Sequence, residues 1–304
     1  MRKRIFLFFL AIMLIAVAIF FTGCGQQAED KKIGKINIMV SILPQIYFVE
    51  RIGGDKVEVS EMIPPGFSPE TYDPSPKQLQ KLQDAVIYFR VGHIPFEKAQ
   101  IEKLKGMNQL MKIVDSSEGV SLLRLAAHSH GEAEHKDEEG HEEGDDPHIW
   151  LSPKLVKIQA KHIYESLVEY SPDDKDYFTK NYDQFILDLD KLDDKLSQAF
   201  APIKNQTILV FHPAFGYLAD AYGFKQKAIE MEGKDPTPAQ LKAIIDEAKA
   251  DNVKVIFVQS QFSTKNAQAV AEEIGGAVVQ IDPLAKDYFT NLESIAETIV
   301  SSLK

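Results

Sequence analysis

The chain has 304 residues, of which 44% are hydrophobic and 26% are charged, and its formal net charge is −11. That hydrophobic fraction excludes a wholly disordered chain, and the negative charge argues against general nucleic-acid binding, which needs a basic surface. The single cysteine excludes an internal disulfide. The length suggests about two domains.

The first 23 residues have the pattern of a secretory signal peptide. Three basic residues precede an unbroken apolar run over residues 5–21, and Gly23 lies directly before the only cysteine, Cys24. This ending resembles the lipobox of bacterial-type lipoproteins, which implies that Cys24 is lipidated and becomes the new N-terminus. The alternative is an uncleaved anchor, since a membrane span needs about 17–25 residues. Either way we expect the mature chain outside the cytoplasm, with residues 24–35 as a lipidated tether.

The mature chain alternates short apolar runs with longer helical patterns, which is typical of βαβ units and a mostly parallel sheet. Four helix starts are indicated by a hydroxyl residue followed by proline, because the hydroxyl caps free N–H groups and proline lacks one. These pairs are Ser75-Pro76, Ser152-Pro153, Ser171-Pro172 and Thr237-Pro238. The predicted strands are residues 36–40, 57–63, 85–91, 207–211, 253–258 and 277–281.

One predicted helix is much longer than the others. From residue 172 to about residue 200, apolar side chains recur at steps of three and four, which indicates an amphipathic helix about 40 Å long. A coiled coil is the alternative, but a single stripe of this length is short for one. Because the helix lies between two sets of strands, we expect it to join two α/β lobes.

The predicted fold is therefore α/β, with two lobes that each contain a mostly parallel sheet flanked by helices and one long helix that bridges them. The predicted boundaries are residues 36–170 for the N-terminal lobe, 171–202 for the linking helix and 203–304 for the C-terminal lobe.

Most of the negative charge lies in one short segment. Residues 128–148 contain nine acidic residues and one lysine, and residues 128–147 lack apolar periodicity, which predicts a surface loop. Loosely tethered imidazoles there would raise the local metal concentration; the alternative is a solvated insertion without such a role. The histidines expected to collect metal are His128, His130, His135 and His141.

Potential metal ligands follow the predicted strands or precede the predicted helices. In an open parallel sheet, ligands bind beyond the carboxyl ends of the strands. His93, His212 and Asp282 follow predicted strands, whereas Glu70 and His148 precede capped helix starts. Imidazole and carboxylate together suit zinc or a neighbouring first-row divalent ion. Each residue also has a simpler explanation as a surface, turn or hydrogen-bonding residue.

These segments together resemble the TroA-like family of solute-binding lipoproteins, which serve ABC transporters in zinc or manganese uptake. The resemblance covers nearly the whole mature chain and implies two α/β lobes that hold a metal ion in the cleft between them. It rests on Pro-Gly-x-x-Pro-x-x-Tyr-x-Pro-x-Pro at 65–76, Asp146-Pro-His-Ile-Trp-Leu-Ser-Pro153, Phe211-His212-Pro, Glu232-Gly-Lys-Asp-Pro-Thr-Pro238, Phe257-Val-Gln-Ser-Gln-Phe262 and Asp282-Pro-Leu.

The resemblance implies that His148 and His212 are ligands and that Asp282 supplies the carboxylate that often completes the site. The family usually has histidine where this chain has Glu70. Either Glu70 ligates directly, or His93 supplies the missing imidazole and Glu70 supports the site from outside. Histidine at position 212 resembles the zinc branch, since manganese-using members typically have glutamate there. A carboxylate-rich site would favour Mn²⁺ or Fe²⁺.

The predicted function is capture of Zn²⁺ outside the cytoplasm and its delivery to an ABC permease, by a non-enzymatic protein. We expect a monomer, held to the membrane by its lipid, without a nucleic-acid partner. The first alternative is uptake of Mn²⁺ or Fe²⁺ by the same mechanism. The second is a metallohydrolase with Glu70 as general base, although the chain has no His-Glu-x-x-His sequence. The third is metal buffering or adhesion.

Overall fold

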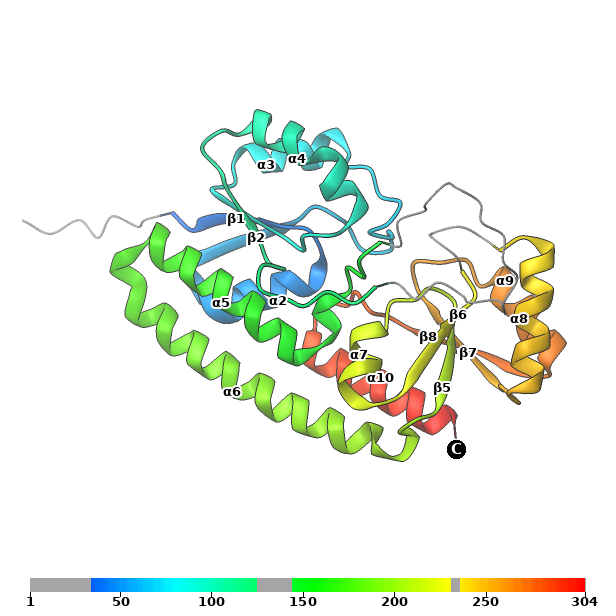
Figure 1. Cartoon of the computed structure of the whole chain (residues 1–304). Helices are drawn as coiled ribbons and strands as arrows, with labels where there is room; N and C mark the ends of the chain where they lie inside the picture. The colour runs from blue at the N-terminus through cyan, green and yellow to red at the C-terminus, as the bar shows by residue number, and fades with distance from the viewer. Residues whose placement is uncertain (1–33, 125–143, 231–235, 304) are drawn as a thin grey trace, which may run out of the picture. The chain divides into compact units, whose positions relative to one another are not determined.

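Two parallel four-stranded sheets organise the computed structural model, which describes residues 34–124, 144–230 and 236–303 (Figure 1). The first sheet has the order β2-β1-β3-β4, and the second has the order β6-β5-β7-β8. The strands of the first sheet are β1 (Ile36–Val40), β2 (Val57–Glu61), β3 (Ile87–Arg90) and β4 (Lys112–Asp115). Those of the second are β5 (Thr207–Val210), β6 (Lys225–Ala228), β7 (Val255–Gln259) and β8 (Ala277–Ile281).

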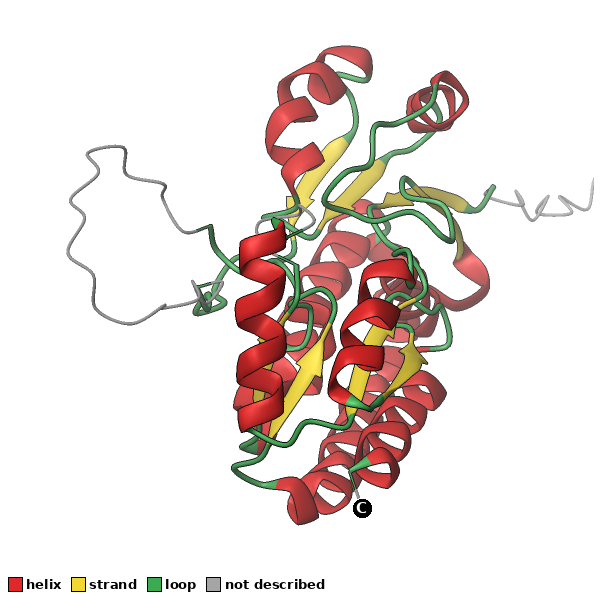
Figure 2. Ribbon diagram, turned by 90° about the vertical axis from the view of Figure 1, so that its right-hand side faces the viewer, coloured by secondary structure: helices red, strands yellow, loops and turns green. Residues whose placement is uncertain are grey.

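Helices flank both sheets, so the predicted α/β class is confirmed (Figure 2). Elements before residue 172 are α2 (Leu43–Gly53), η1 (Gly54–Lys56), α3 (Pro76–Gln83), α4 (Pro95–Met107), η2 (Ile149–Leu151) and α5 (Pro153–Tyr170). Next come η3 (Pro172–Asp174), α6 (Lys175–Phe200) and η4 (Ala201–Ile203). The last helices are α7 (Gly216–Tyr222), α8 (Pro238–Ala250), α9 (Lys265–Ile274) and α10 (Tyr288–Ser302).

Strands β4 and β6 were not predicted, and both lie at an edge of their sheet. Edge strands have one neighbour and a solvent-facing side, so they need no continuous apolar run and often carry lysine. Strand β6 accordingly has the sequence Lys-Gln-Lys-Ala. The four hydroxyl–proline pairs all begin helical segments, although Ser171 precedes the short η3 rather than α6 itself.

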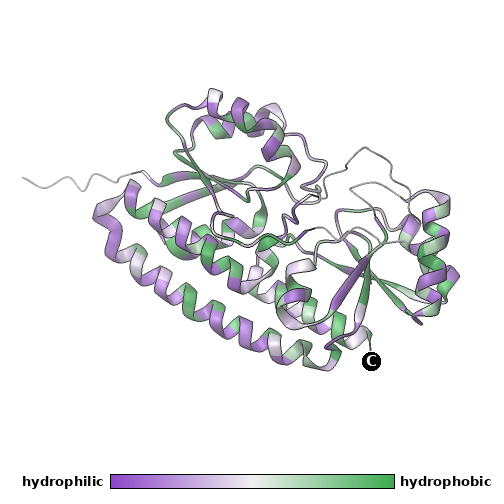
Figure 3. Cartoon of the chain, in the orientation of Figure 1, coloured by the Kyte–Doolittle hydropathy of each residue, from purple (hydrophilic) through white to green (hydrophobic). Residues whose placement is uncertain are grey.

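Helix α6 is the predicted long helix between the lobes, and its apolar stripe is buried. Figure 3 shows hydrophobic and hydrophilic residues alternating along it, as expected of an amphipathic helix. It packs against α2 and α5, which precede it in the chain, and against α7 and α10, which follow it. The buried side chains are Phe178, Phe185, Leu189, Leu192, Leu196 and Phe200.

The C-terminal helix α10 also contacts both lobes. It packs along α6, and at its start the ring of Tyr288 lies edge-on to Phe48 of α2 with ring centroids 4.9 Å apart. Lys286, just before α10, forms an ion pair with Glu50 at 2.9 Å. The segment 203–304 therefore supplies the second sheet and also returns to the N-terminal lobe.

Hydrogen bonds join the lobes near the carboxyl ends of the strands. The indole N–H of Trp150 donates to the carbonyl oxygen of Pro283 at 2.8 Å, and the hydroxyl of Tyr217 donates to the carbonyl oxygen of Asp146 at 2.9 Å. The segment before α5 is thereby held against the second lobe.

The predicted signal peptide, Cys24 and most of the tether lie outside the described residues. So do the four histidines of the acidic segment: His128, His130, His135 and His141. Among the residues that the structure describes, no helix combines the length and apolar character that a membrane span requires.

Candidate metal site

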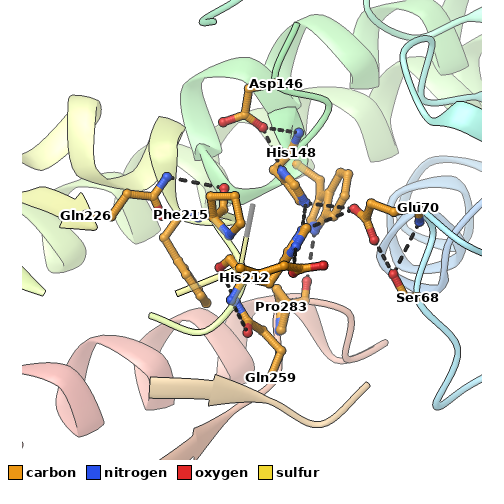
Figure 4. Close-up of polar contacts among 12 residues, drawn as sticks. Ser68, Glu70, Asp146, His148, His212, Phe215, Gln226, Gln259 and Pro283 are labelled. Carbon is orange, nitrogen blue, oxygen red and sulfur yellow. Dashed lines mark hydrogen bonds and ion pairs between the residues drawn. The ribbon is translucent and has the colours of Figure 1, made fainter. Parts of the chain in front are cut away.

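Glu70, His148 and His212 direct one oxygen and two nitrogens at a common point (Figure 4). The Nε2 atoms of the two histidines lie 3.2 Å apart, and Glu70 Oε1 lies 3.2 Å from one and 3.3 Å from the other. Both imidazoles are buried, and the Glu70 side chain is 15% exposed. In the described part of the chain this is the one group of three or more possible metal-binding side chains.

The dimensions of this triangle fit a tetrahedral zinc ion. With metal–nitrogen and metal–oxygen bonds of about 2.0–2.1 Å, neighbouring ligand atoms of a tetrahedron lie about 3.3–3.4 Å apart. The three observed separations are 3.2, 3.2 and 3.3 Å. The side chains can therefore hold a divalent ion after shifts of only a few tenths of an ångström, with a fourth position available to another ligand.

His148 is positioned by the aspartate two residues before it. Asp146 Oδ1 accepts a hydrogen bond from the backbone N–H of His148 at 2.9 Å and lies 2.6 Å from its Nδ1. Asp146 is itself 2% exposed. A carboxylate at Nδ1 places the proton there and leaves Nε2 free to bind metal, as is usual for metal-ligating histidines.

His212 has the same arrangement on the other lobe. It follows β5 by two residues, and its Nδ1 lies 2.6 Å from Glu230 Oε2. The amide of buried Gln259 fixes the backbone, because it accepts from the N–H of His212 at 3.2 Å and donates to its carbonyl oxygen at 2.6 Å. The imidazole also stacks on Phe262.

Glu70 lies in the loop between β2 and α3. The hydroxyl of Ser68 donates to Glu70 Oε2 and accepts from the backbone N–H of Glu70, so the other oxygen, Oε1, faces the two imidazoles. Glu70 itself thus lies next to both histidines. This is the arrangement expected if Glu70, rather than His93, is the ligand.

Electrostatics in the cluster favour a proton on the imidazoles when no metal is bound. Burial opposes charge on His148, but Asp146 and Glu70 prevail and raise its pKa to about 9. Burial also opposes charge on His212, and Glu230 and Glu70 raise its pKa. Burial favours a neutral Glu70, but the two imidazoles hold its pKa well below the ordinary value. A metal ion must displace these protons, since it binds neutral imidazole.

His93 lies away from this cluster. It follows β3, which is separated from β2 by β1, whereas Glu70 belongs to the loop after β2. Strands are spaced about 4.8 Å apart, so the two loops begin about 10 Å from each other. His93 faces Asp145 instead, with Nδ1 3.5 Å from Oδ2.

Asp282 also lies outside the group of converging ligand atoms, because edge strand β8 is separated from β5 by β7. Its Oδ1 accepts from Gln261 Nε2 and from the backbone N–H of Leu284, both at 2.9 Å. The side chain lines an interlobe cavity of about 200 Å³ together with Phe67 and other residues of the loop that carries Glu70.

Sequence reasoning did not assign roles to Asp146, Glu230 and Gln259. Asp146 had a local signal, since an aspartate two residues before a histidine can accept its backbone N–H. Gln259 directly follows the predicted strand 253–258, and nothing in its neighbourhood points to His212. Glu230 follows the unpredicted edge strand β6, so its approach to His212 had no local signal.

Comparison with known proteins identifies the family. Residues 38–302 match the family described as zinc-uptake complex component A, periplasmic, or ZnuA. The chain belongs to the ZnuA family. This confirms the resemblance to TroA-like proteins and its zinc-uptake branch.

Individual members agree with this assignment. The high-affinity zinc uptake system protein ZnuA of Bacillus subtilis (strain 168) is 31% identical over 281 residues, which cover 91% of this chain and 88% of that protein. A crystal structure of a zinc-bound ZnuA deletion mutant has 40% identity and a TM-score of 0.79, and covers 88% of this chain and 98% of that one. The periplasmic zinc-binding protein TroA from Treponema pallidum shares the fold, with 22% identity, a TM-score of 0.78 and coverage of 89% and 99%.

Proposed function

We propose that this ZnuA-family chain captures Zn²⁺ outside the cytoplasm and delivers it to the permease of an ABC importer, with Glu70, His148 and His212 as protein ligands. The observation that carries the proposal is the convergence of three ligand atoms from opposite lobes at zinc-like separations. A ligand set divided between lobes is suited to cargo, because separation of the lobes would take the ligands from the ion.

The surroundings of the site support binding rather than catalysis. Asp146 and Glu230 are both engaged with histidine Nδ1 atoms. Glu70 faces the two Nε2 atoms directly. A hydrolytic zinc needs a carboxylate or other base free to act on bound water, and these three carboxylates are occupied by the imidazoles. We propose on this ground that the protein is not an enzyme.

The site composition supports zinc as the cargo. Two imidazoles and one carboxylate form a ligand set known from zinc sites, and an oxygen-rich set would suit Mn²⁺ better. Zinc-uptake relatives of similar length and fold support the same ion. We further propose that Cys24 is lipidated and that the protein acts as a membrane-tethered monomer.

Competition with a chromophoric zinc chelator tests the site. We expect His148→Ala and His212→Ala each to weaken zinc binding more than about 100-fold, because loss of a supporting carboxylate already costs about 10–100-fold. His162→Ala is the matched control, since its Nε2 contacts only the backbone oxygen of Glu118 among the described residues. Wild-type affinity in both site variants would overturn the assignment.

A further inference from the structure

His93 has a buried ring nitrogen that finds no hydrogen-bond partner among the residues that the structure describes. Its Nδ1 is shielded from solvent, and the carboxylate oxygen that it faces, Asp145 Oδ2, is 3.5 Å away, too far for a good hydrogen bond. Burial and the charge of Lys98 lower the pKa of His93, which favours the neutral ring that a metal ion binds. The nitrogen and the carboxylate oxygen therefore face each other at a separation longer than a good hydrogen bond.

The backbone around His93 is fixed. The fully buried carboxylate of Glu97 accepts hydrogen bonds from the N–H groups of Val91 and Gly92 at 2.8 and 2.7 Å. Gly92 has a φ of +114°, and a Cβ atom there would lie 2.3 Å from Ser117 Oγ. The position of His93 is therefore set by packing and hydrogen bonds.

Asp145 is held equally firmly. It forms an isolated antiparallel bridge with Arg124, and the next residue, Asp146, donates its N–H to the carbonyl oxygen of Leu123 at 2.8 Å. The tie from Tyr217 to the carbonyl oxygen of Asp146 adds a third restraint. A pre-positioned imidazole and carboxylate are what a metal ion requires of its ligands.

We propose that His93 and Asp145 form a second, weaker binding site for a divalent cation, separate from the site at Glu70, His148 and His212. The Nδ1–Oδ2 separation of 3.5 Å is close to the ligand–ligand distance of about 3.3–3.4 Å around tetrahedral zinc. The side chains are 22% and 34% exposed, so water can complete the coordination. This second site rests on the proposed function, since it would receive the same ion.

Charge and position indicate a transit site. Lys98 and Arg90 oppose a cation at His93, and Asp145 and Asp115 favour one, although Asp115 is paired with Arg90. With only two protein ligands, and with positive and negative charges nearby that largely offset each other, such a site would bind a cation weakly and reversibly. Asp145 is adjacent in the chain to Asp146, whose carboxylate lies against Nδ1 of His148, so one short segment supplies groups to both sites.

Anomalous diffraction from crystals of the full chain soaked in zinc salt tests both sites independently. We expect one peak between Glu70, His148 and His212 at low zinc concentration, and a second between His93 and Asp145 at higher concentration. A filled first site with no density at His93 would overturn this inference and leave the proposed function intact. An empty first site would overturn the proposed function instead.

Equilibrium dialysis with zinc provides a solution measurement. His93→Ala and Asp145→Asn should each lose one weakly bound zinc equivalent and keep the tightly bound one, whereas His162→Ala should keep both. Equal thermal unfolding of the metal-free variants would show that they fold alike. Unchanged zinc stoichiometry in both His93→Ala and Asp145→Asn would contradict a second site there.

Discussion

The Nε2 atoms of His148 and His212 lie 3.2 Å apart, although 64 positions separate the two residues in the chain. Each ring directs its Nδ1 at a buried carboxylate, so the two Nε2 atoms are turned toward each other and toward Glu70. Two neutral rings in this arrangement would oppose their lone pairs, and two protonated rings would oppose their charges. A divalent cation that displaces the protons binds both lone pairs and removes the repulsion between the rings.

The carboxylate at position 70 should influence which metal is bound. Glu70→Ala removes one of three ligands, so we expect zinc affinity to fall more than about 100-fold. Glu70→His replaces oxygen with nitrogen and should retain zinc while weakening Mn²⁺ relative to it, since harder ions prefer oxygen ligands. Competition titrations with both metals measure the two effects. A zinc-to-manganese preference unchanged in Glu70→His would show that this carboxylate does not ligate.

The carboxylates behind the histidines should matter nearly as much as the histidines. Glu230→Gln removes the charge that orients His212, and we expect about a 10–100-fold loss of zinc affinity. Asp190→Gln, in an exposed ion pair with Lys157, is the control and should bind zinc normally. Chelator competition gives both values; equal affinities for the two variants would mean that Glu230 has only a packing role.

Zinc should stabilise the protein, and more so at higher pH. At a free zinc concentration 100 times Kd, binding adds about 2.7 kcal/mol to the free energy of unfolding, which raises Tm by several degrees. The folded-state pKa of His148, about 9, exceeds that of an unfolded histidine, about 6.5. Protonated His148 therefore stabilises the metal-free protein at low pH, and this stabilisation is lost as pH rises between these values. Over the same range fewer protons compete with zinc for the imidazole, so zinc binds more tightly.

Thermal unfolding with and without zinc across this pH range measures the effect. We expect the zinc-induced rise in Tm to increase from about pH 6.5 to about pH 9 in the wild type and to be nearly absent in His148→Ala. A zinc-induced rise in Tm that does not change with pH would show that zinc displaces no proton from His148.

A buried carboxyl in the N-terminal lobe should give the metal-free protein a second pH dependence. Burial raises the pKa of Glu97 from 4.5 to about 7, despite its hydrogen bonds from Ser41, Gly92 and Val91. Between these values the folded protein retains a proton that the unfolded chain has released, so stability decreases as pH rises. The decrease amounts to about 3 kcal/mol and levels off above about pH 7.

Urea denaturation of metal-free wild type and Glu97→Gln at several pH values isolates this group. The variant should lack the decrease between about pH 4.5 and about pH 7. Glu102→Gln, an exposed residue on the same helix, should behave as wild type. If the wild type and Glu97→Gln show parallel pH profiles, Glu97 does not titrate in this range.

The sequence by itself determined most of the helices and strands and the chemistry of the candidate ligands. Local periodicity and hydroxyl–proline caps depend on neighbouring residues, so they located the core strands, the helix starts and the long α6. Strand ends marked His212, and a capped helix start marked His148 and Glu70, because polar groups at such positions face the edge of a parallel sheet. Edge strands β4 and β6 were not predicted because their four-residue sequences, Lys-Ile-Val-Asp and Lys-Gln-Lys-Ala, contain no distinct apolar run.

Only the tertiary structure decided which ligands meet. His93 and Asp282 also follow strands, and local sequence gives them the same standing as His212. The strand order separates them from the cluster by an intervening strand in each sheet, and it brings Glu230 from an edge strand to His212. Strand order and lobe packing depend on contacts between residues far apart in the chain. Such contacts leave no periodic trace in the sequence, so the choice among candidate ligands depended on the fold.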